Sequence, residues 1–174
     1  MAKVAFYGAI SLDGFLADQA DSLQWLFETS QGGVETYSAF YEKIGSAVMG
    51  RISYQETKKI LAGEPLNPGK QNYVFSNTLM DDLPDAIVVK QEPAAFISQL
   101  KAQEEKMIWI VGGGGLVTEL VQADLIDEWW IQITPILLGK GKRLFEEADY
   151  QQRLKLVDTT IMGEFVELHY RREK

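Results

Sequence analysis

The residues most suggestive of chemistry are four consecutive glycines, Gly112 to Gly115, followed by Leu116. An apolar run, typical of a buried strand, leads into them, and a helix is predicted to follow. Glycine allows the backbone to approach a ligand closely, and the free N–H groups of a helix start attract anions. The segment therefore predicts a pyrophosphate site, with a tight turn that holds no ligand as the alternative. It is not a Rossmann fingerprint, because the third glycine of that spacing is missing.

Two further strand ends carry residues that suit phosphate. Gly50, Arg51 and Ser53 lie between a short apolar strand and a helix, and Ser76 and Asn77 follow the next strand. Arginine can grip a phosphate bidentately, and ligands of open α/β sheets bind at the carboxyl ends of strands. We therefore expect these five residues to bind the same cofactor as the glycines. The alternatives are a helix start with a solvated Arg51 and ordinary turn chemistry after the later strand.

Asp13 and Trp25 are the candidates for the substrate side of such a site. Asp13 lies in a Ser-Leu-Asp-Gly turn that ends the first apolar run. We predict that it is catalytic, as a general acid/base or as a group that orients substrate, with turn capping as the alternative. Trp25 is predicted to stack on a flat heterocycle, with core packing as the alternative.

The elements that must position these residues change character along the chain. The first two thirds alternate strands and helices, whereas the last third is predicted to be strands only. This pattern predicts an α/β domain over residues 1–174, with helices on both faces of a mostly parallel central sheet and antiparallel strands at its C-terminal side. Strands are expected at 4–10, 47–49, 72–75, 86–89, 107–111, 129–138, 154–161 and 165–170, and helices at 34–44, 51–61, 93–103 and up to 122.

Composition excludes several classes of protein. The net charge of −8 argues against a nucleic-acid surface, and no stretch is long and apolar enough to suggest a membrane partner. With no cysteine and one histidine, the chain is expected to have no disulfide and no metal site. The N-terminal apolar run reads poorly as a signal peptide, so we expect a cytoplasmic location.

The ordered set of motifs resembles the dihydrofolate reductase superfamily. More closely, it resembles the reductase domain of the bacterial riboflavin-biosynthesis deaminase/reductase and its stand-alone relatives. The shared features are the Ser-Leu-Asp-Gly turn, Met49-Gly50-Arg51, Ser76, the Gly112-Gly113 pair and a Pro-x-x-Leu-Gly-x-Gly segment at 135–141. The resemblance covers nearly the whole chain.

This resemblance implies a three-layer dihydrofolate-reductase-like fold and an oxidoreductase that uses NADPH. Arg51 and Ser53 would serve the cofactor phosphates, Ser76 and Asn77 would lie near its 2′-phosphate, and the peptide bond after Gly112 would be cis. The substrate would be a small heterocycle, either 5-amino-6-(5-phosphoribosylamino)uracil or a pterin-like compound. The alternatives are a nucleotide-binding module and a dimeric structural protein of the same fold without turnover.

The late strands also predict how the molecule assembles. Trp129 and Trp130 are adjacent, so their side chains point to opposite faces of one strand. An earlier helix could cover the second face, but none is predicted after residue 127. We therefore expect a homodimer through the C-terminal strands, as the resemblance also implies. His169, in the last strand, is expected to be a packed or solvated strand residue.

Overall fold

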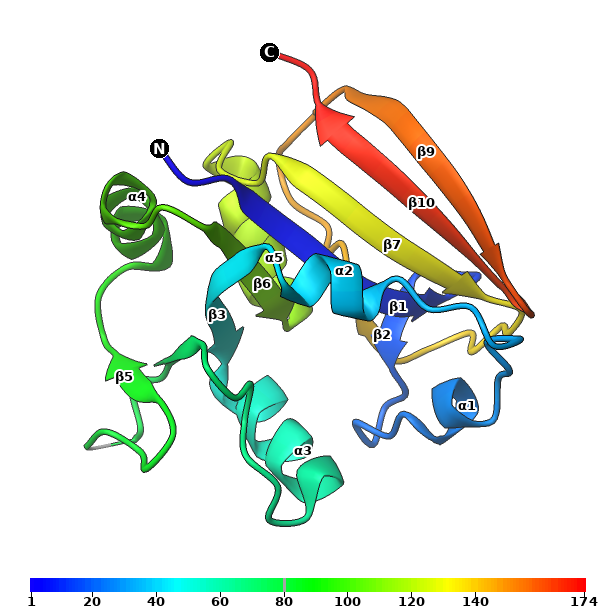
Figure 1. Ribbon diagram of the computed structural model, residues 1–174, viewed down its shortest axis with the longest axis horizontal. Helices are drawn as coiled ribbons and strands as arrows, with labels where there is room; N and C mark the ends of the chain where they lie inside the picture. The colour runs from blue at the N-terminus through cyan, green and yellow to red at the C-terminus, as the bar shows by residue number, and fades with distance from the viewer. Residues whose placement is uncertain (80) are drawn as a thin grey trace.

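One eight-stranded sheet runs through the molecule (Figure 1) in the order β5-β4-β3-β6-β1-β7-β10-β9, and β2 and β8 form a separate pair. The computed structural model describes residues 1–79 and 81–174. The strands are β1 (Val4–Ser11), β2 (Phe15–Ala17), β3 (Ile44–Gly50), β4 (Gln71–Phe75), β5 (Ile87–Val89), β6 (Met107–Gly112), β7 (Glu128–Thr134), β8 (Lys142–Arg143), β9 (Leu154–Met162) and β10 (Phe165–Arg172). The helices are α1 (Gln24–Phe27), α2 (Tyr37–Tyr41), α3 (Arg51–Leu61), α4 (Pro93–Gln103) and α5 (Gly114–Gln122).

The strand directions change from parallel to antiparallel along the chain, as predicted. Strands β1, β3, β4, β5, β6 and β7 pair in parallel, and β10 and β9 are added as antiparallel strands at one side. The expected α/β fold, with a mostly parallel sheet and antiparallel C-terminal strands, is therefore confirmed. Because the first strands are parallel, the carboxyl ends of β3, β4 and β6 lie at the same edge of the sheet.

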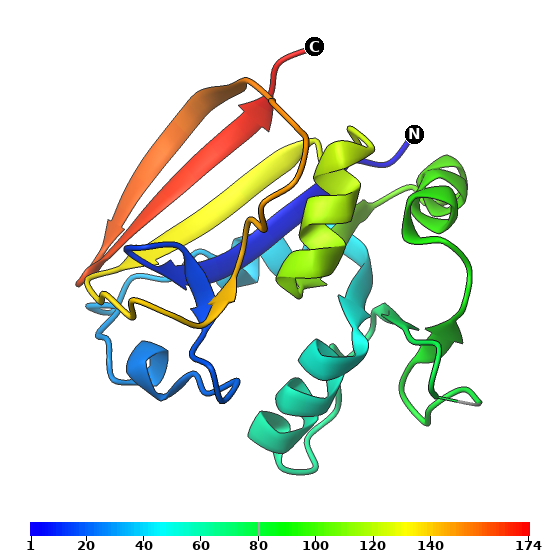
Figure 2. The same cartoon turned by 180° about the vertical axis from the view of Figure 1, so that it is seen from behind.

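Each face of the sheet carries its own apolar core. Apolar residues of α4 and α5 pack on one face with Phe6, Ile110 and Trp129. Residues Phe40 of α2 and Tyr54 of α3 belong to the cluster on the other face, which also contains Trp130. Seen from behind, α5 lies across the sheet while the β9–β10 hairpin extends to one side (Figure 2).

Three element predictions differ from the structure. The helix expected at 34–44 is only α2, because Ile44 already belongs to β3, where it is fully buried. The strand expected at 129–138 ends at Thr134, since Pro135 has no N–H to donate to a neighbouring strand. Short elements α1, β2 and β8 were not predicted at all.

The two neighbouring tryptophans are both covered within the chain. Trp129 is 1% exposed and its ring lies 5.8 Å from that of Phe6, while Trp130 is 9% exposed and packs 5.3 Å from Phe40 of α2. The ring of His169 stacks on the ring of Trp130, with 4.0 Å between their centroids, so His169 is a packed strand residue. Helix α2, which lies earlier in the chain, thus covers the second face of β7. The argument that predicted a homodimer from an uncovered tryptophan therefore no longer applies. No helix in the described ranges is long and apolar enough to cross a bilayer.

Candidate functional site

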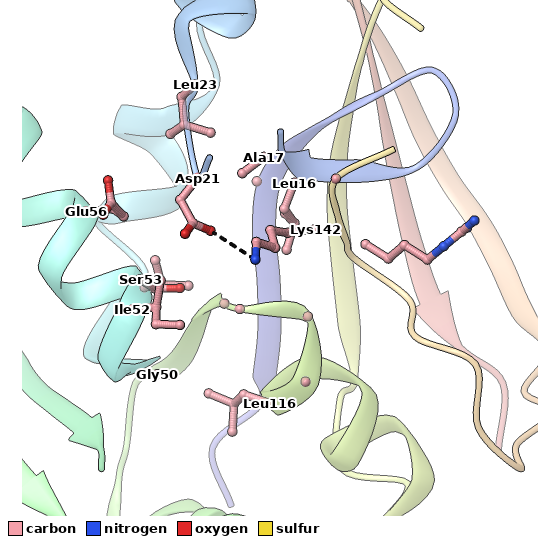
Figure 3. Close-up of a pocket in the computed structure, with 18 of the residues that line it drawn as sticks. Leu16, Ala17, Asp21, Leu23, Gly50, Ile52, Ser53, Glu56, Leu116 and Lys142 are labelled. Carbon is pink, nitrogen blue, oxygen red and sulfur yellow. Dashed lines mark ion pairs between the residues drawn. The ribbon is translucent and has the colours of Figure 1, made fainter. Parts of the chain in front are cut away.

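A cavity of about 810 Å³ opens where β3 and β6 end. Gly50 and the glycines from Gly112 to Gly115 form one side of it, at the first turns of α3 and α5. Residues of β2, the following loop and β8 form the opposite side (Figure 3). Two helix N-termini therefore meet at one cavity, and each offers unpaired N–H groups and a positive dipole end.

The glycine turn leaves room for a ligand at one position and not at the next. A Cβ on Gly113 would have Ser53 Oγ as its nearest neighbour, at 3.6 Å, whereas a Cβ on Gly114 would lie 1.8 Å from the backbone oxygen of Arg143. The protein itself therefore requires glycine at Gly114, while the space beside Gly113 belongs to the cavity. The peptide bond between Gly112 and Gly113 is cis, as the resemblance implied.

Arg51 joins this cavity to a second, smaller one. The second cavity, of about 310 Å³, is lined by Ser76 and Asn77 together with Arg51, which also lines the first. The guanidinium is exposed and donates a hydrogen bond to Gln55 at 3.0 Å. The structure thus brings the three predicted strand ends to one continuous edge.

Ser76 already has local partners. Its hydroxyl oxygen accepts hydrogen bonds from the backbone N–H groups of Thr78, at 3.2 Å, and Leu79, at 3.0 Å. These are the contacts of an ordinary serine turn, which was the alternative for this position. Ser76 can still donate its hydroxyl proton to a ligand.

Asp13 lies outside the residues that line either cavity. Its carboxylate accepts hydrogen bonds from the Ser11 hydroxyl at 2.6 Å and from the backbone N–H groups of Gly139, at 2.7 Å, and Leu138, at 3.1 Å. The bond from Ser11, followed by those from the backbone, lowers the pKa of Asp13 to about 2. These contacts match the turn-capping alternative rather than the predicted catalytic role.

Trp25 is likewise not a lining residue. It is 8% exposed, and its indole N–H donates to the backbone oxygen of Ser22 at 3.1 Å. The cavity wall is formed instead by its neighbours Leu23 and Leu26. Core packing, the alternative to substrate stacking, accounts for Trp25.

The cavity also contains ionisable residues that sequence reasoning missed. Asp21, in the loop after β2, and Lys142, in β8, lie next to each other on the same wall, with a 4.0 Å ion pair between them (Figure 3). Tyr7, on β1, lines the cavity as well, and burial raises the pKa of its phenol. No local signal marks these residues, because the pairing of the very short strands β2 and β8 brings Lys142 to the cavity.

Comparison with known proteins decides the family. A family model described as the RibD C-terminal domain matches residues 2–168. The chain belongs to the RibD C-terminal domain family. A curated relative, the uncharacterized protein YwjB of Bacillus subtilis, is 36% identical to this RibD-type chain over 170 residues, or 97% of each chain.

Solved structures agree with this assignment. A structure of a putative riboflavin biosynthesis protein from Shewanella superposes with a TM-score of 0.86 at 29% identity, and the match covers all of both chains. Dihydrofolate reductase from Enterococcus faecalis, complexed with NADP(H), superposes with a TM-score of 0.62 at 17% identity, over 99% of this chain and 97% of that one. The RibD-type chain therefore has the dihydrofolate-reductase-like fold that the motif order implied.

Proposed function

We propose that this RibD-type chain is an NADPH-dependent reductase that transfers a hydride to a small heterocyclic substrate. The observation that carries the proposal is the position of Arg51, which lines both cavities beside the starts of α3 and α5. A dinucleotide is long enough to need both cavities, and its phosphates would meet the two helix N-termini.

The residues at these positions fit the cofactor. The start of α5, from Gly113 to Leu116, has the free backbone N–H groups that a pyrophosphate requires, and there is open space beside Gly113. Arg51 would bind phosphate, with Ser53 beside it, and Ser76 and Asn77 would meet the 2′-phosphate in the smaller cavity. The cofactor supplies the hydride, and the protein holds it against the substrate and excludes water.

Part of the larger cavity suits a flat ring, because Gly8 and Ala9 of β1 and Leu23 and Leu26 around α1 form its wall there. Charged side chains line other parts of it, among them Asp21, Glu56, Lys142, Glu146 and Glu147. Membership of the RibD family and the name of the Shewanella relative support a reductase connected with riboflavin biosynthesis. The candidate substrates are 5-amino-6-(5-phosphoribosylamino)uracil and pterin-like heterocycles.

Oxidation of NADPH by the purified protein tests this function. We expect NADPH to be consumed with at least one member of a panel of aminouracils and oxidised pteridines, and less rapidly by Arg51→Ala. Tight binding of NADPH without consumption across the panel would favour the alternative, a nucleotide-binding module without turnover.

A further inference from the structure

The turn of the β9–β10 hairpin packs on the segment that follows α1. Gly163 and Glu164 form this turn, because Met162 and Phe165 are the last residues that pair across the hairpin. Both views of the fold show the turn beside the segment that joins α1 to α2 (Figure 1 and Figure 2). Two parts of the chain that are 134 positions apart therefore meet here.

The contact is made by backbone on both sides. A Cβ on Gly163 would lie 2.5 Å from both Gly32 N and Ser30 O, and a Cβ on Gly32 would lie 2.7 Å from Gly163 Cα. Two hydrogen bonds join the same parts of the chain. The Glu164 N–H donates to Ser30 O at 3.0 Å, and the Ser30 N–H donates to the Glu164 carboxylate at 2.8 Å. Only glycine permits so close an approach, so this contact is specific to these positions.

The turn is the fixed partner in this contact. Met162 and Phe165, on either side of it, are 1% and 3% exposed, and β10 pairs with β7 of the main sheet. Ser30 and Gly32, in contrast, are exposed and belong to no helix or strand. The hairpin turn therefore determines where the segment after α1 lies.

Helix α1 needs support from outside. It has four residues, whereas an isolated helix shorter than about 12–15 residues is marginal in water. Trp25 is buried and holds one side of it. Its C-terminal end leads directly into the contact, because Thr29 donates from its N–H to Leu26 O at 3.1 Å and from its hydroxyl to Trp25 O at 3.0 Å. A displacement of Ser30 would thus be passed on to α1.

The residues around α1 form one wall of the larger cavity. Leu23, directly before the helix, and Leu26, within it, both line this cavity. Figure 3 shows Leu23 and Leu116, which belongs to the start of α5, at opposite ends of the view. A shift of α1 would therefore change the cavity away from the glycine turn.

We propose that the β9–β10 turn positions α1 and thereby determines the shape of the substrate wall, with Gly32 and Glu164 as positioning residues. The proposal rests on the proposed function, in which α1 would contact the heterocycle and α5 the cofactor. Damage to the turn contact should then weaken substrate binding and leave NADPH binding unchanged.

Two neighbouring glycines provide a matched pair of variants. Gly32 and Gly33 have positive φ angles, of 61° and 76°, so alanine is strained at either position. A Cβ on Gly33, however, would meet no atom of the described chain within 4 Å. Gly32→Ala therefore forces the segment away from the turn, whereas Gly33→Ala reproduces the backbone strain alone.

Hydrogen exchange followed by mass spectrometry reports on α1 without any ligand. The amides of residues 24–29 should exchange about tenfold faster in Gly32→Ala than in Gly33→Ala, because α1 loses tertiary support. The amides of α5 should differ less than about twofold between the two variants. Equal exchange of residues 24–29 in the two folded variants, checked by circular dichroism, would overturn the proposal.

Glu164 tests the same contact from the other side without changing a glycine. Glu164→Ala removes the acceptor of the Ser30 N–H and should speed exchange of residues 24–29 at least about threefold. Glu164→Gln keeps an oxygen that can accept this bond, so its exchange should stay within about twofold of the unaltered protein. A change in Glu164→Gln as large as that in Glu164→Ala would contradict the proposal.

Kinetics connect the contact to the substrate. With a heterocycle that the unaltered protein reduces, KM should be at least about fivefold higher in Gly32→Ala than in Gly33→Ala, while the NADPH Kd differs less than about twofold. An equal KM in the two variants would refute the role in substrate binding. If the unaltered protein oxidises NADPH with no heterocycle, the proposed function fails, and faster exchange in Gly32→Ala would still support the positioning of α1 by the turn.

Discussion

At the scale of single residues, the proposed function makes Arg51 the side chain on which cofactor choice should depend. Because Arg51 lines both cavities, a dinucleotide bound across them would bring its 2′-phosphate within reach of this side chain. We expect Arg51→Ala to weaken NADPH binding by about 1.5–3 kcal/mol, the range for a hydrogen bond to a charged group, and NADH binding by less.

Calorimetric titration of both cofactors measures this difference. Arg153→Ala is a suitable control, since Arg153 is exposed in the loop before β9 and does not line either cavity. Equal losses for the two cofactors would show that Arg51 does not read the 2′-phosphate.

Asp13 gives a prediction about pH and stability. Because its folded pKa is about 2, below the ordinary value of 3.8, the ionised form stabilises the fold above about pH 4. That contribution should disappear as the pH falls from about 4 through 2. Asp13→Asn should therefore have a lower Tm at neutral pH and a smaller further loss between pH 4 and pH 2 than the unaltered protein.

Thermal melts over this pH range, at constant ionic strength, check the prediction. Parallel melting curves for the two proteins would mean that the carboxylate does not anchor the turn. A large loss of NADPH-dependent turnover in Asp13→Asn, with an unchanged Tm, would instead restore the catalytic role.

Sequence reasoning located the cavity residues that directly follow a recognisable strand. Gly113 and Arg51 directly follow strands, so their place beside the cavity could be predicted from topology. The hydrogen-bonded group of Tyr7, Thr36 and Glu167 could not be found this way, because residues from four distant segments make its hydrogen bonds. Along the last strand, Glu167 is buried whereas its neighbour Val166 is 41% exposed, the reverse of what their polarity alone would suggest.

At the scale of elements, the start of α5 determines whether the cavity can hold a pyrophosphate. Gly113→Ala should fold, because a Cβ there meets no atom closer than 3.6 Å, but its methyl group would occupy space next to the N–H groups that we propose bind the pyrophosphate. We expect it to abolish NADPH binding. Gly114→Ala should behave differently, since its Cβ would meet the Arg143 backbone oxygen at 1.8 Å and destabilise the fold by at least about 2 kcal/mol.

Chemical denaturation and NADPH titration of both variants separate the two effects. Normal NADPH binding by Gly113→Ala would place the pyrophosphate elsewhere. Normal stability of Gly114→Ala would show that β8 can move away from the helix.

Longer elements with a clear signal were predictable and short ones were not. The bounds of α3 and α4 match the prediction, because α3 has a strong helical period and α4 begins at Pro93, a residue favoured in the first turn of a helix. Strands β2 and β8 have three and two residues, too few for any period to be visible. Their pairing, which closes one side of the cavity, depends on a contact between residues more than a hundred positions apart.

At the scale of the whole molecule, we propose a homodimer through the outer face of the β9–β10 hairpin. The tryptophan argument no longer supports it, but a different apolar surface does. Ile161 and Val166 pair across the hairpin and are 75% and 41% exposed, and Leu156 on the same strand as Ile161 is 50% exposed. An exposed apolar face of this kind is typical of a protein–protein interface.

Light scattering at micromolar concentration measures the assembly. The expected species has twice the 19.6 kDa chain mass, and Ile161→Lys should convert it to the monomer. Ile87→Lys is the control, because Ile87 is 40% exposed on β5, the edge strand at the other side of the sheet. A monomer in the unaltered protein would refute the dimer.

A structure of the protein crystallised with NADP⁺ tests the central claim most directly. The account predicts the pyrophosphate against the backbone N–H groups of Gly113 to Leu116, with the 2′-phosphate beside Arg51 and Ser76 and the nicotinamide in the larger cavity near Tyr7. Density for the cofactor at another place, or a cavity that stays empty at saturating NADP⁺, would contradict it.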